Sequence, residues 1–372
     1  VITDFGAVGD GQADCTDAIA GAIAAARASG GGRIVVPPGN YLTGPVHLED
    51  RTNLLVQKDA TLSFIPEPER YLPEVFTRWE GLEFMGYSPL IYAYGKTDVA
   101  ITGEGTLNGG ADKSNWWPWK GKWKGKFEEA EFTQQEARDQ LVADAEAGVP
   151  PEDRHYSDGA FLRPPFIQTY HCRNVLVEGV TITQSPFWLI NPVLCTSVTV
   201  RGVTCNSFGP NNDGCNPESS KDVLIENCVF DTGDDCIAIK SGRNADGRRV
   251  GVPSENIIVS NCEMKAGHGG VVMGSELSGG IKNVFAENCR MSSPDLERGI
   301  RIKTNAMRGG GVENLNVRNI EVGNVRDLFV INFYYEEGEN GPFSPRVSDI
   351  DIRDVECENA ARVMDIRGFD HA

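Results

Sequence analysis

Four short polar motifs between Asn211 and Lys303 carry the side chains best suited to acid–base chemistry. Together they supply three carboxylates, one histidine and two cations. A protonated carboxyl beside an ionised one can protonate a leaving oxygen and activate a water molecule, and neighbouring cations would bind an acidic substrate. The motifs are Asn211-Asn212-Asp213-Gly214, Gly233-Asp234-Asp235, Gly267-His268-Gly269 and Arg301-Ile302-Lys303.

Each motif also has a simple structural interpretation. Asn-Asn-Asp-Gly is a turn sequence, Asp-Asp suits a solvated corner, Gly-His-Gly suits a tight loop, and Arg-Ile-Lys is the alternation of a half-buried strand. A functional interpretation therefore requires that the fold bring all four together.

The elements that must position these motifs form a repeat. Nine rows begin with a small polar residue followed by apolar residues at alternate positions, and from the third row onward the starts lie 23, 25, 34, 27, 31 and 35 residues apart. Alternation predicts strands, and a coil this short cannot bury a core alone, so neighbouring coils must stack. The row starts are Asn53, Asp98, Asn174, Ser197, Asp222, Asn256, Asn283, Asn314 and Asp349.

A second column lies six residues after each of the last seven starts, and it fixes the alignment of the coils. On this alignment the row Asp235 to Ser241 stacks on Asp213 to Ser219 before it, and on the rows from Gly269 and Arg298 after it. Stacked strands lie about 4.8 Å apart, so the four motifs should share one groove. The second column is Val180, Val203, Cys228, Cys262, Cys289, Ile320 and Val355.

In these motifs the chain resembles the polygalacturonase family of glycoside hydrolases, and the resemblance runs from Asp4-Phe5-Gly6-Ala7-Val8-Gly9-Asp10 to the last rows. It implies an all-β, right-handed parallel β-helix with an N-terminal capping helix, and hydrolysis of pectic polysaccharides with inversion. Asn212, where many members have threonine, is a departure that bears on the subfamily.

The resemblance also implies a role for each site residue. Asp234 corresponds to the general acid, while Asp213 and Asp235 correspond to the pair that holds and deprotonates water. His268 corresponds to the histidine that supports the acid. Arg301 and Lys303 correspond to the residues that bind the uronate at the cleavage point.

The residue types also suit such a reaction on physical grounds. Inversion needs one protonated carboxyl and one ionised carboxylate, and crowded carboxylates cannot all ionise, so one pKa is raised. Cations in the same groove suit a substrate that is itself a uronide.

Bulk composition excludes some classes of binding partner. With 35 basic and 53 acidic residues, the net charge of −18 argues against nucleic acid and anionic membrane surfaces, and no stretch approaches a membrane span. We expect one elongated domain, 1–372, acting as a monomer on pectic oligo- or polysaccharide in an extracellular or periplasmic setting. Ten cysteines show no zinc-ligand spacing, and three of them share the inward column, so we expect free thiols, no metal and no cofactor.

Two segments fall outside the rows. Residues 1–32 form a cap, with a helix from about Asp14 as N-cap to Ala28. Residues 108–165 form an insertion. It begins with a run of four tryptophans among lysines, from Trp116 to Lys126. A helix follows, with Thr133 and Glu136 as a capping box and Gly148 as its stop. The tryptophans either stack on sugar rings or anchor the insertion.

The insertion and the run Arg243 to Pro253 resemble exo-acting members, so we expect release of galacturonate from a chain end. Endo action and cleavage of rhamnogalacturonan remain alternatives. From other classes, the alternatives are a Ca²⁺-dependent pectic lyase and a non-catalytic polysaccharide-binding β-helix.

Overall fold

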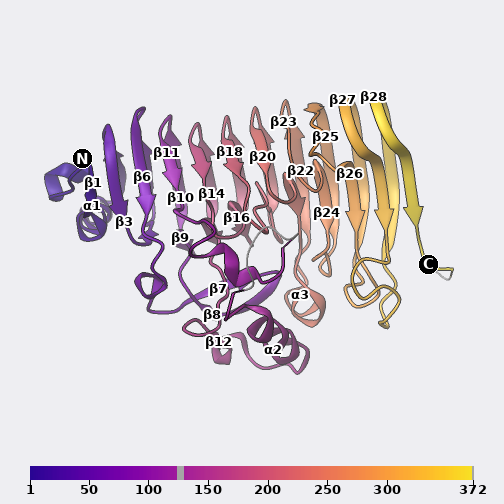
Figure 1. Cartoon of the computed structure of the whole chain (residues 1–372), viewed down its shortest axis with the longest axis horizontal. Helices are drawn as coiled ribbons and strands as arrows, with labels where there is room; N and C mark the ends of the chain where they lie inside the picture. Colours follow the sequence, from indigo (N-terminus) through magenta and orange to yellow (C-terminus); the bar gives the residue numbers. More distant parts are fainter. Residues whose placement is uncertain (124–129, 371–372) are drawn as a thin grey trace.

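The chain winds into a right-handed parallel β-helix, as expected, and its coils follow one another along the long axis of the molecule (Figure 1). The computed structural model describes residues 1–123 and 130–370. Lys126, the end of the predicted tryptophan- and lysine-rich run, lies outside the described residues.

Three parallel ladders make the faces of the solenoid. The first ladder carries the predicted rows, and its order is β2 (Gly32–Val36), β5 (Thr52–Val56), β10 (Thr97–Gly103), β14 (Arg173–Glu178), β17 (Thr196–Arg201), β19 (Lys221–Glu226) and β22 (Ser254–Ser260). The second is β1 (Asp10–Asp14), β3 (Gly39–Thr43), β6 (Ala60–Phe64), β11 (Thr106–Asn108), β15 (Thr181–Thr183), β18 (Thr204–Ser207), β20 (Val229–Thr232) and β23 (Glu263–Met264).

The third ladder supports the polar motifs. It runs through β4 (Val46–His47), β9 (Ile91–Tyr94), β13 (Ile167–Tyr170), β16 (Ile190–Val193), β21 (Ile237–Ile239), β24 (Val271–Gly274) and β26 (Arg298–Lys303). Single bridges at Cys215 and Glu218 join β16 to β21. The last coils are continuous strands that bend across faces: β25 (Ile281–Met291), β27 (Gly311–Asn332) and β28 (Arg346–Arg367).

The polar residue that begins each row has a backbone reason. From the second row on, every row start has a positive φ, for example 58° at Asp98 and 58° at Asn256. Asparagine and aspartate tolerate this left-handed conformation better than other residues with a Cβ. The side chains also stack: Asn283 Nδ2 donates to Asn256 Oδ1 at 2.9 Å, and Asn314 Nδ2 donates to Asn283 Oδ1 at 2.8 Å. These residues thus turn the chain into each new coil.

The predicted inward column is confirmed. Cys228, Cys262 and Cys289 are buried and free, in register with Ile320 and Val355 of the last coils. All ten cysteines are free thiols. They therefore act as small core residues.

Helix α1 (Thr16–Ala28) covers the N-terminal end of the solenoid, after the short η1 (Ile2–Phe5). Its N-cap is Cys15, so the prediction of Asp14 at that position was wrong by one residue. Asp14 belongs to strand β1, yet its Oδ1 still accepts a hydrogen bond from the Thr16 backbone N–H at 3.0 Å.

Two insertions project from one side of the solenoid (Figure 1). The predicted one holds η3 (Trp117–Lys120), α2 (Gln135–Glu146), η4 (Pro151–Asp153) and β12 (His155–Tyr156). The other was not predicted: after η2 (Pro68–Tyr71), strands β7 (Val75–Trp79) and β8 (Leu82–Gly86) form an antiparallel hairpin, and β12 adds to it. Helix α3 (Asn244–Val250) packs on α2 and β8.

The predicted capping box of α2 was wrong. The helix begins one residue later, with Gln134 as its N-cap, and no side chain forms a capping hydrogen bond. Thr133 Oγ1 lies 3.5 Å from the Gln135 backbone nitrogen. The predicted stop is confirmed, since Gly148 has φ 74° directly after the helix.

Candidate active site

The third ladder stacks the four motifs as the alignment predicted. Ile237 pairs with Cys215 on one side and with Val271 on the other, and Val271 pairs with Ile300. The His268 backbone N–H donates to the Asp234 carbonyl at 3.1 Å, so these residues lie on adjacent coils. Residues up to ninety positions apart thereby meet on one patch.

A cavity of about 430 Å³ opens over this patch. Five of the six predicted site residues line it: Asp213, Asp234, His268, Arg301 and Lys303. The sixth, Asp235, is fully buried beneath them, and Lys303 Nζ donates to its Oδ2 at 2.7 Å. All six predicted residues are therefore brought together.

Asp213 is buried at the floor of the cavity. Asn216 Nδ2 donates to its Oδ2 at 2.8 Å, and Lys240 Nζ lies 3.9 Å from the same oxygen. Burial, then repulsion from Asp234, raises the pKa of Asp213 well above its usual range in spite of Lys240. Asp213 is therefore the carboxyl of this cluster that holds a proton most readily.

Asp234 is ionised in the free site. Burial, the largest single effect, acts to raise its pKa, but His268, whose Nδ1 lies 2.9 Å from Asp234 Oδ1, together with Lys303 and Lys240 lowers the pKa below its usual value. The same pairing raises the pKa of His268. Asp234 Oδ1 also accepts the Asp235 backbone N–H at 2.9 Å. In the free site, the mobile proton of this pair therefore belongs to the imidazole.

Asp235 and the two cations complete the catalytic side of the cavity. Asp235 Oδ1 has no hydrogen-bond partner among the described residues, which leaves an acceptor beside the site. The Arg301 guanidinium lies 5.4 Å, and Lys303 Nζ 5.2 Å, from the centre of the Tyr335 ring. Tyr335 thus supports both cations from the following coil.

Tyr335, Lys240 and Glu276 also line the cavity and had no role assigned from the sequence. Tyr335 stood among adjacent aromatic and acidic residues with no signal to single it out. Lys240 ends the aligned row that begins at Asp235, so its position over the groove was available from the alignment. Its Nζ donates to Glu276 Oε2 at 2.8 Å and lies 4.6 Å from the Trp188 ring centre. Glu276 had no alignment signal, because it follows the end of β24.

The insertions build the opposite wall of the cavity. Lys120 and Arg138 come from the predicted insertion, and Glu80 comes from the turn of the β7–β8 hairpin. Arg138 Nε donates to Glu80 Oε2 at 2.8 Å, and Arg243 Nη1 donates to the same oxygen at 2.9 Å. A connected ion-pair cluster therefore lies on the side of the cavity that the insertions form.

Three of the four tryptophans anchor the insertion, as one of the two interpretations predicted. Trp116 is buried, Trp117 Nε1 donates to the Ser185 carbonyl at 2.9 Å, and Trp119 lies 4.8 Å from Trp116, ring centre to ring centre. These three anchor the insertion, whereas Trp123 lines the cavity.

Arg163 connects the insertion to the first catalytic motif. Its Nη1 donates to the carbonyls of Pro186 at 3.0 Å and Pro210 at 2.7 Å, and its Nη2 donates to Asn211 Oδ1 at 2.7 Å. The side chain is fully buried, and burial lowers its pKa to about 9. The turn that presents Asp213 is thus held by a residue of the insertion.

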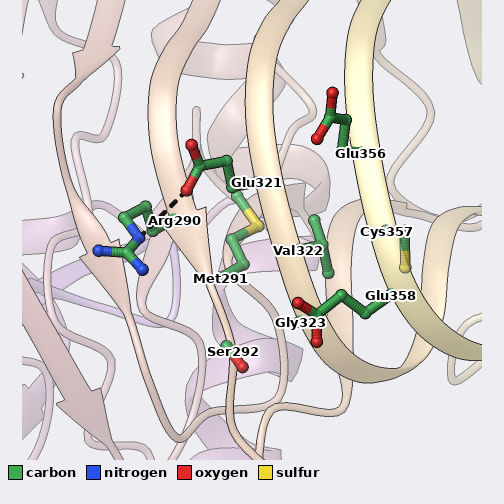
Figure 2. A pocket seen from close by; sticks show the side chains of 9 residues that line it. All are labelled: Arg290, Met291, Ser292, Glu321, Val322, Gly323, Glu356, Cys357 and Glu358. Atoms are coloured by element: carbon green, nitrogen blue, oxygen red, sulfur yellow. Dashed lines mark ion pairs between the residues drawn. The ribbon is translucent and has the colours of Figure 1, made fainter.

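A second hollow, of about 400 Å³, lies on the C-terminal strands β25, β27 and β28 (Figure 2). Three of its nine lining residues are glutamates, and Arg290 Nε pairs with Glu321 Oε2 at 3.3 Å. It contains no residue of the four motifs. The chemistry predicted from the sequence therefore belongs to the first cavity.

Within residues 1–123 and 130–370, no group of three histidine, cysteine or acidic side chains is arranged to hold a metal ion. None of the described helices has the length and apolar character to cross a membrane.

Comparison with known proteins points to one family. Residues 155–365 match the model of glycosyl hydrolases family 28, and residues 1–55 match a model described as rhamnogalacturonase A/epimerase, pectate lyase-like. In structure, the chain is similar to a hyperthermoactive exopolygalacturonase from Thermotoga maritima, with a TM-score of 0.96 and 47% identity, covering 100% of this chain and 83% of that one.

Two curated sequences are also similar. One is a probable polygalacturonase from Vitis vinifera, 28% identical over 99% of this chain and 70% of its own length. The other is an exo-poly-alpha-D-galacturonosidase from Dickeya chrysanthemi, 28% identical over 89% of this chain and 56% of its own length. The chain thus spans just over half of the Dickeya protein.

Proposed function

The chain belongs to glycosyl hydrolases family 28, and from that premise we propose that it is an inverting hydrolase of α-1,4-galacturonosyl linkages that releases galacturonate from a chain end. The observation that carries the proposal is the cavity in which three aspartates, His268 and two cations meet, with one side closed by the insertions. A polyuronide accounts for acids and cations in the same site.

We assign Asp234 as the general acid. It donates a proton to the glycosidic oxygen as the bond from that oxygen to the anomeric carbon breaks. Because Asp234 is ionised in the free site, the proton must reach it when substrate binds, and His268 is its hydrogen-bonded neighbour at 2.9 Å. A bound uronate adds negative charge and excludes water, and both effects raise the pKa of Asp234.

We assign Asp213 and Asp235 to the attacking water. The water oxygen bonds to the anomeric carbon from the opposite face, and its proton passes to a carboxylate of this pair. Asp235 suits the role of base because its Oδ1 is free among the described residues and its Oδ2 is held by Lys303. Asp213, with its raised pKa, is suited to hydrogen-bond the water.

Arg301 and Lys303 would bind the uronate at the cleavage point. Charge-assisted hydrogen bonds to a carboxylate are worth about 1.5–3 kcal/mol each. Tyr335 supports this assignment, because its ring lies under both cations and limits where a sugar can sit.

Two observations support exo action. The Thermotoga and Dickeya relatives are both named as exo-acting enzymes. The wall of Glu80, Arg138 and Arg243 would also block a chain that continued past the catalytic aspartates. An enzyme that cuts inside a chain needs a groove open at both ends.

We further propose that residues 1–372 act as one domain and as a monomer, outside the cytoplasm. The continuous ladders support the first part, since no coil separates from its neighbours. The polymeric substrate supports the location. A single calorimetric unfolding transition and the mass in solution would test the first two points.

Product analysis on polygalacturonate tests the main proposal. Galacturonic acid should appear from the first time points, the freshly released sugar should have the inverted anomeric configuration, and Asp234→Asn should abolish release while keeping its circular dichroism. A ladder of oligomers would instead indicate endo action. Products with ultraviolet absorbance would indicate a lyase, and no release of reducing sugar from any pectic chain would indicate a binding protein.

A further inference from the structure

The cations of the catalytic cavity divide into two groups. Among the described residues, six lysine and arginine side chains line it, and four of them are in close ion pairs. The pairs are Arg138 with Glu80 at 2.8 Å, Lys240 with Glu276 at 2.8 Å, Arg298 with Glu297 at 2.7 Å, and Lys303 with Asp235 at 2.7 Å. The other two, Arg301 and Lys120, have no ion-pair partner within the described part of the chain.

The two unpaired cations come from different parts of the fold. Arg301 lies on β26 among the catalytic motifs and is accounted for by the uronate at the cleavage point. Lys120 is the last residue of η3 and belongs to the insertion. Nothing in the proposed reaction so far uses it.

Lys120 lines the same cavity as the wall residue Glu80 and the proposed acid Asp234. Burial lowers the pKa of its ammonium, while Glu80 and Asp234 act in the opposite direction, so both acids lie near it. The nearest wall acid is already neutralised, because Glu80 accepts from Arg138 and Arg243. A partly buried cation without a partner is unfavourable until an anion arrives.

The backbone that carries Lys120 is well fixed. The Gly121 N–H donates to the Pro118 carbonyl at 2.9 Å, and the Gln134 N–H donates to the Trp119 carbonyl at 2.8 Å. The Trp119 ring contacts Tyr87 and Trp116. The backbone that carries the ammonium is therefore fixed before substrate arrives, which limits the entropy lost on binding.

We propose that Lys120 binds the carboxylate of the galacturonate at the chain end, while Arg301 binds the carboxylate across the cleaved bond. This inference rests on the proposed function and names its specificity: consecutive galacturonates present two carboxylates, and the cavity has two cations that lack an ion-pair partner among the described residues. The enzyme should then require a terminal galacturonate whose carboxylate is free, and should reject a chain whose terminal residue is methyl-esterified.

The test compares Lys120→Met and Lys120→Arg with Lys113→Met, an exposed lysine of the same insertion outside the cavity. On trigalacturonate, Lys120→Met should lose about 10- to 100-fold in kcat/KM, and Lys120→Arg should recover part of it. Lys113→Met should match the wild type. Esterifying the terminal carboxylate should cost the wild type a similar factor and cost Lys120→Met almost nothing.

Binding supplies a readout that does not depend on turnover. In an Asp234→Asn background, calorimetric titration with trigalacturonate should give a weaker affinity for Lys120→Met than for Lys113→Met. Equal affinities, or equal discrimination against the ester by Lys120→Met and wild type, would overturn the inference while leaving the proposed hydrolysis intact. A wild type that neither cleaves nor binds galacturonides would overturn both.

Discussion

The Nδ1 atom of His268 lies 2.9 Å from Oδ1 of Asp234, across the step between two neighbouring coils. Each residue shifts the other: against burial, His268 together with Lys303 and Lys240 lowers the pKa of Asp234, and Asp234 raises the pKa of His268. In the proposed mechanism, this pair determines where the catalytic proton resides before substrate binds.

The pair predicts the alkaline limb of the activity profile. If His268 holds the proton that Asp234 must deliver, kcat should fall as pH rises through the raised pKa of His268, above its ordinary value of about 6.5. His268→Gln removes the cation, so Asp234 should titrate at higher pH and kcat should drop by about 10²-fold. Measured kcat against pH for the two proteins checks this, and an unchanged alkaline limb would contradict it.

The same pair predicts how stability depends on pH. His268 has a raised pKa in the folded state, so its contribution is complete below about pH 6.5 and is lost as pH rises through the folded pKa. Asp234 has a lowered pKa, so its contribution is complete above about pH 4 and is lost as pH falls. Wild type and His268→Gln should differ most in free energy of unfolding between about pH 4 and pH 6.5. Denaturant melts of both proteins across pH would test this. A difference in unfolding free energy that does not vary with pH would refute it.

Arg301 and Lys303 should act on different kinetic constants. Lys303 holds Asp235 at 2.7 Å, whereas Arg301 lies on Tyr335 without a carboxylate partner among the described residues. Arg301→Gln should therefore mainly raise KM for galacturonides, by about 10-fold. Lys303→Met should mainly lower kcat, because the carboxylate proposed as base loses its charge partner. Steady-state kinetics on trigalacturonate separates the two, and identical effects of both variants would argue against distinct roles.

Much of this site could be predicted because the coil constrains it. Once Asn256 and Asn283 are recognised as row starts with left-handed backbone, alternation fixes which residues face out, and the pairing of Ile237 with Val271 follows. The proximity of Asp213 to Asp235 is then a matter of counting residues. Because each coil stacks directly on its neighbour, its register follows from the row pattern alone.

The insertions could not be predicted in this way, because no stacked neighbour fixes them. Glu80 reaches the cavity from an antiparallel hairpin whose strands have no counterpart in adjacent coils. The capping box at Thr133 failed because packing at Gln134, whose backbone bonds Trp119, determines where α2 begins. Lys120 gave no signal beyond its charge. Contacts between segments far apart in sequence decide these positions.

Arg163 should couple the insertion to catalysis. It is fully buried and donates to the Pro210 carbonyl and to Asn211 Oδ1, each at 2.7 Å, so it holds the turn that precedes Asp213. Arg163→Met keeps the apolar stem but leaves these acceptors without a donor, which should cost about 2–4 kcal/mol in free energy of unfolding. It should also lower kcat/KM by 10-fold or more, since small displacements of a catalytic group are costly.

The matched control for that variant is Arg173→Met, an exposed arginine on β14. It should change neither the unfolding free energy nor kcat/KM by a measurable amount. Denaturant melts give the first quantity, and trigalacturonate kinetics well below the melting temperature give the second. If Arg163→Met lost stability but kept full kcat/KM in its folded state, the insertion would serve only to stabilise the fold. Loss of both is expected, because the hydrogen bonds that bury Arg163 are the ones that fix the Asp213 turn.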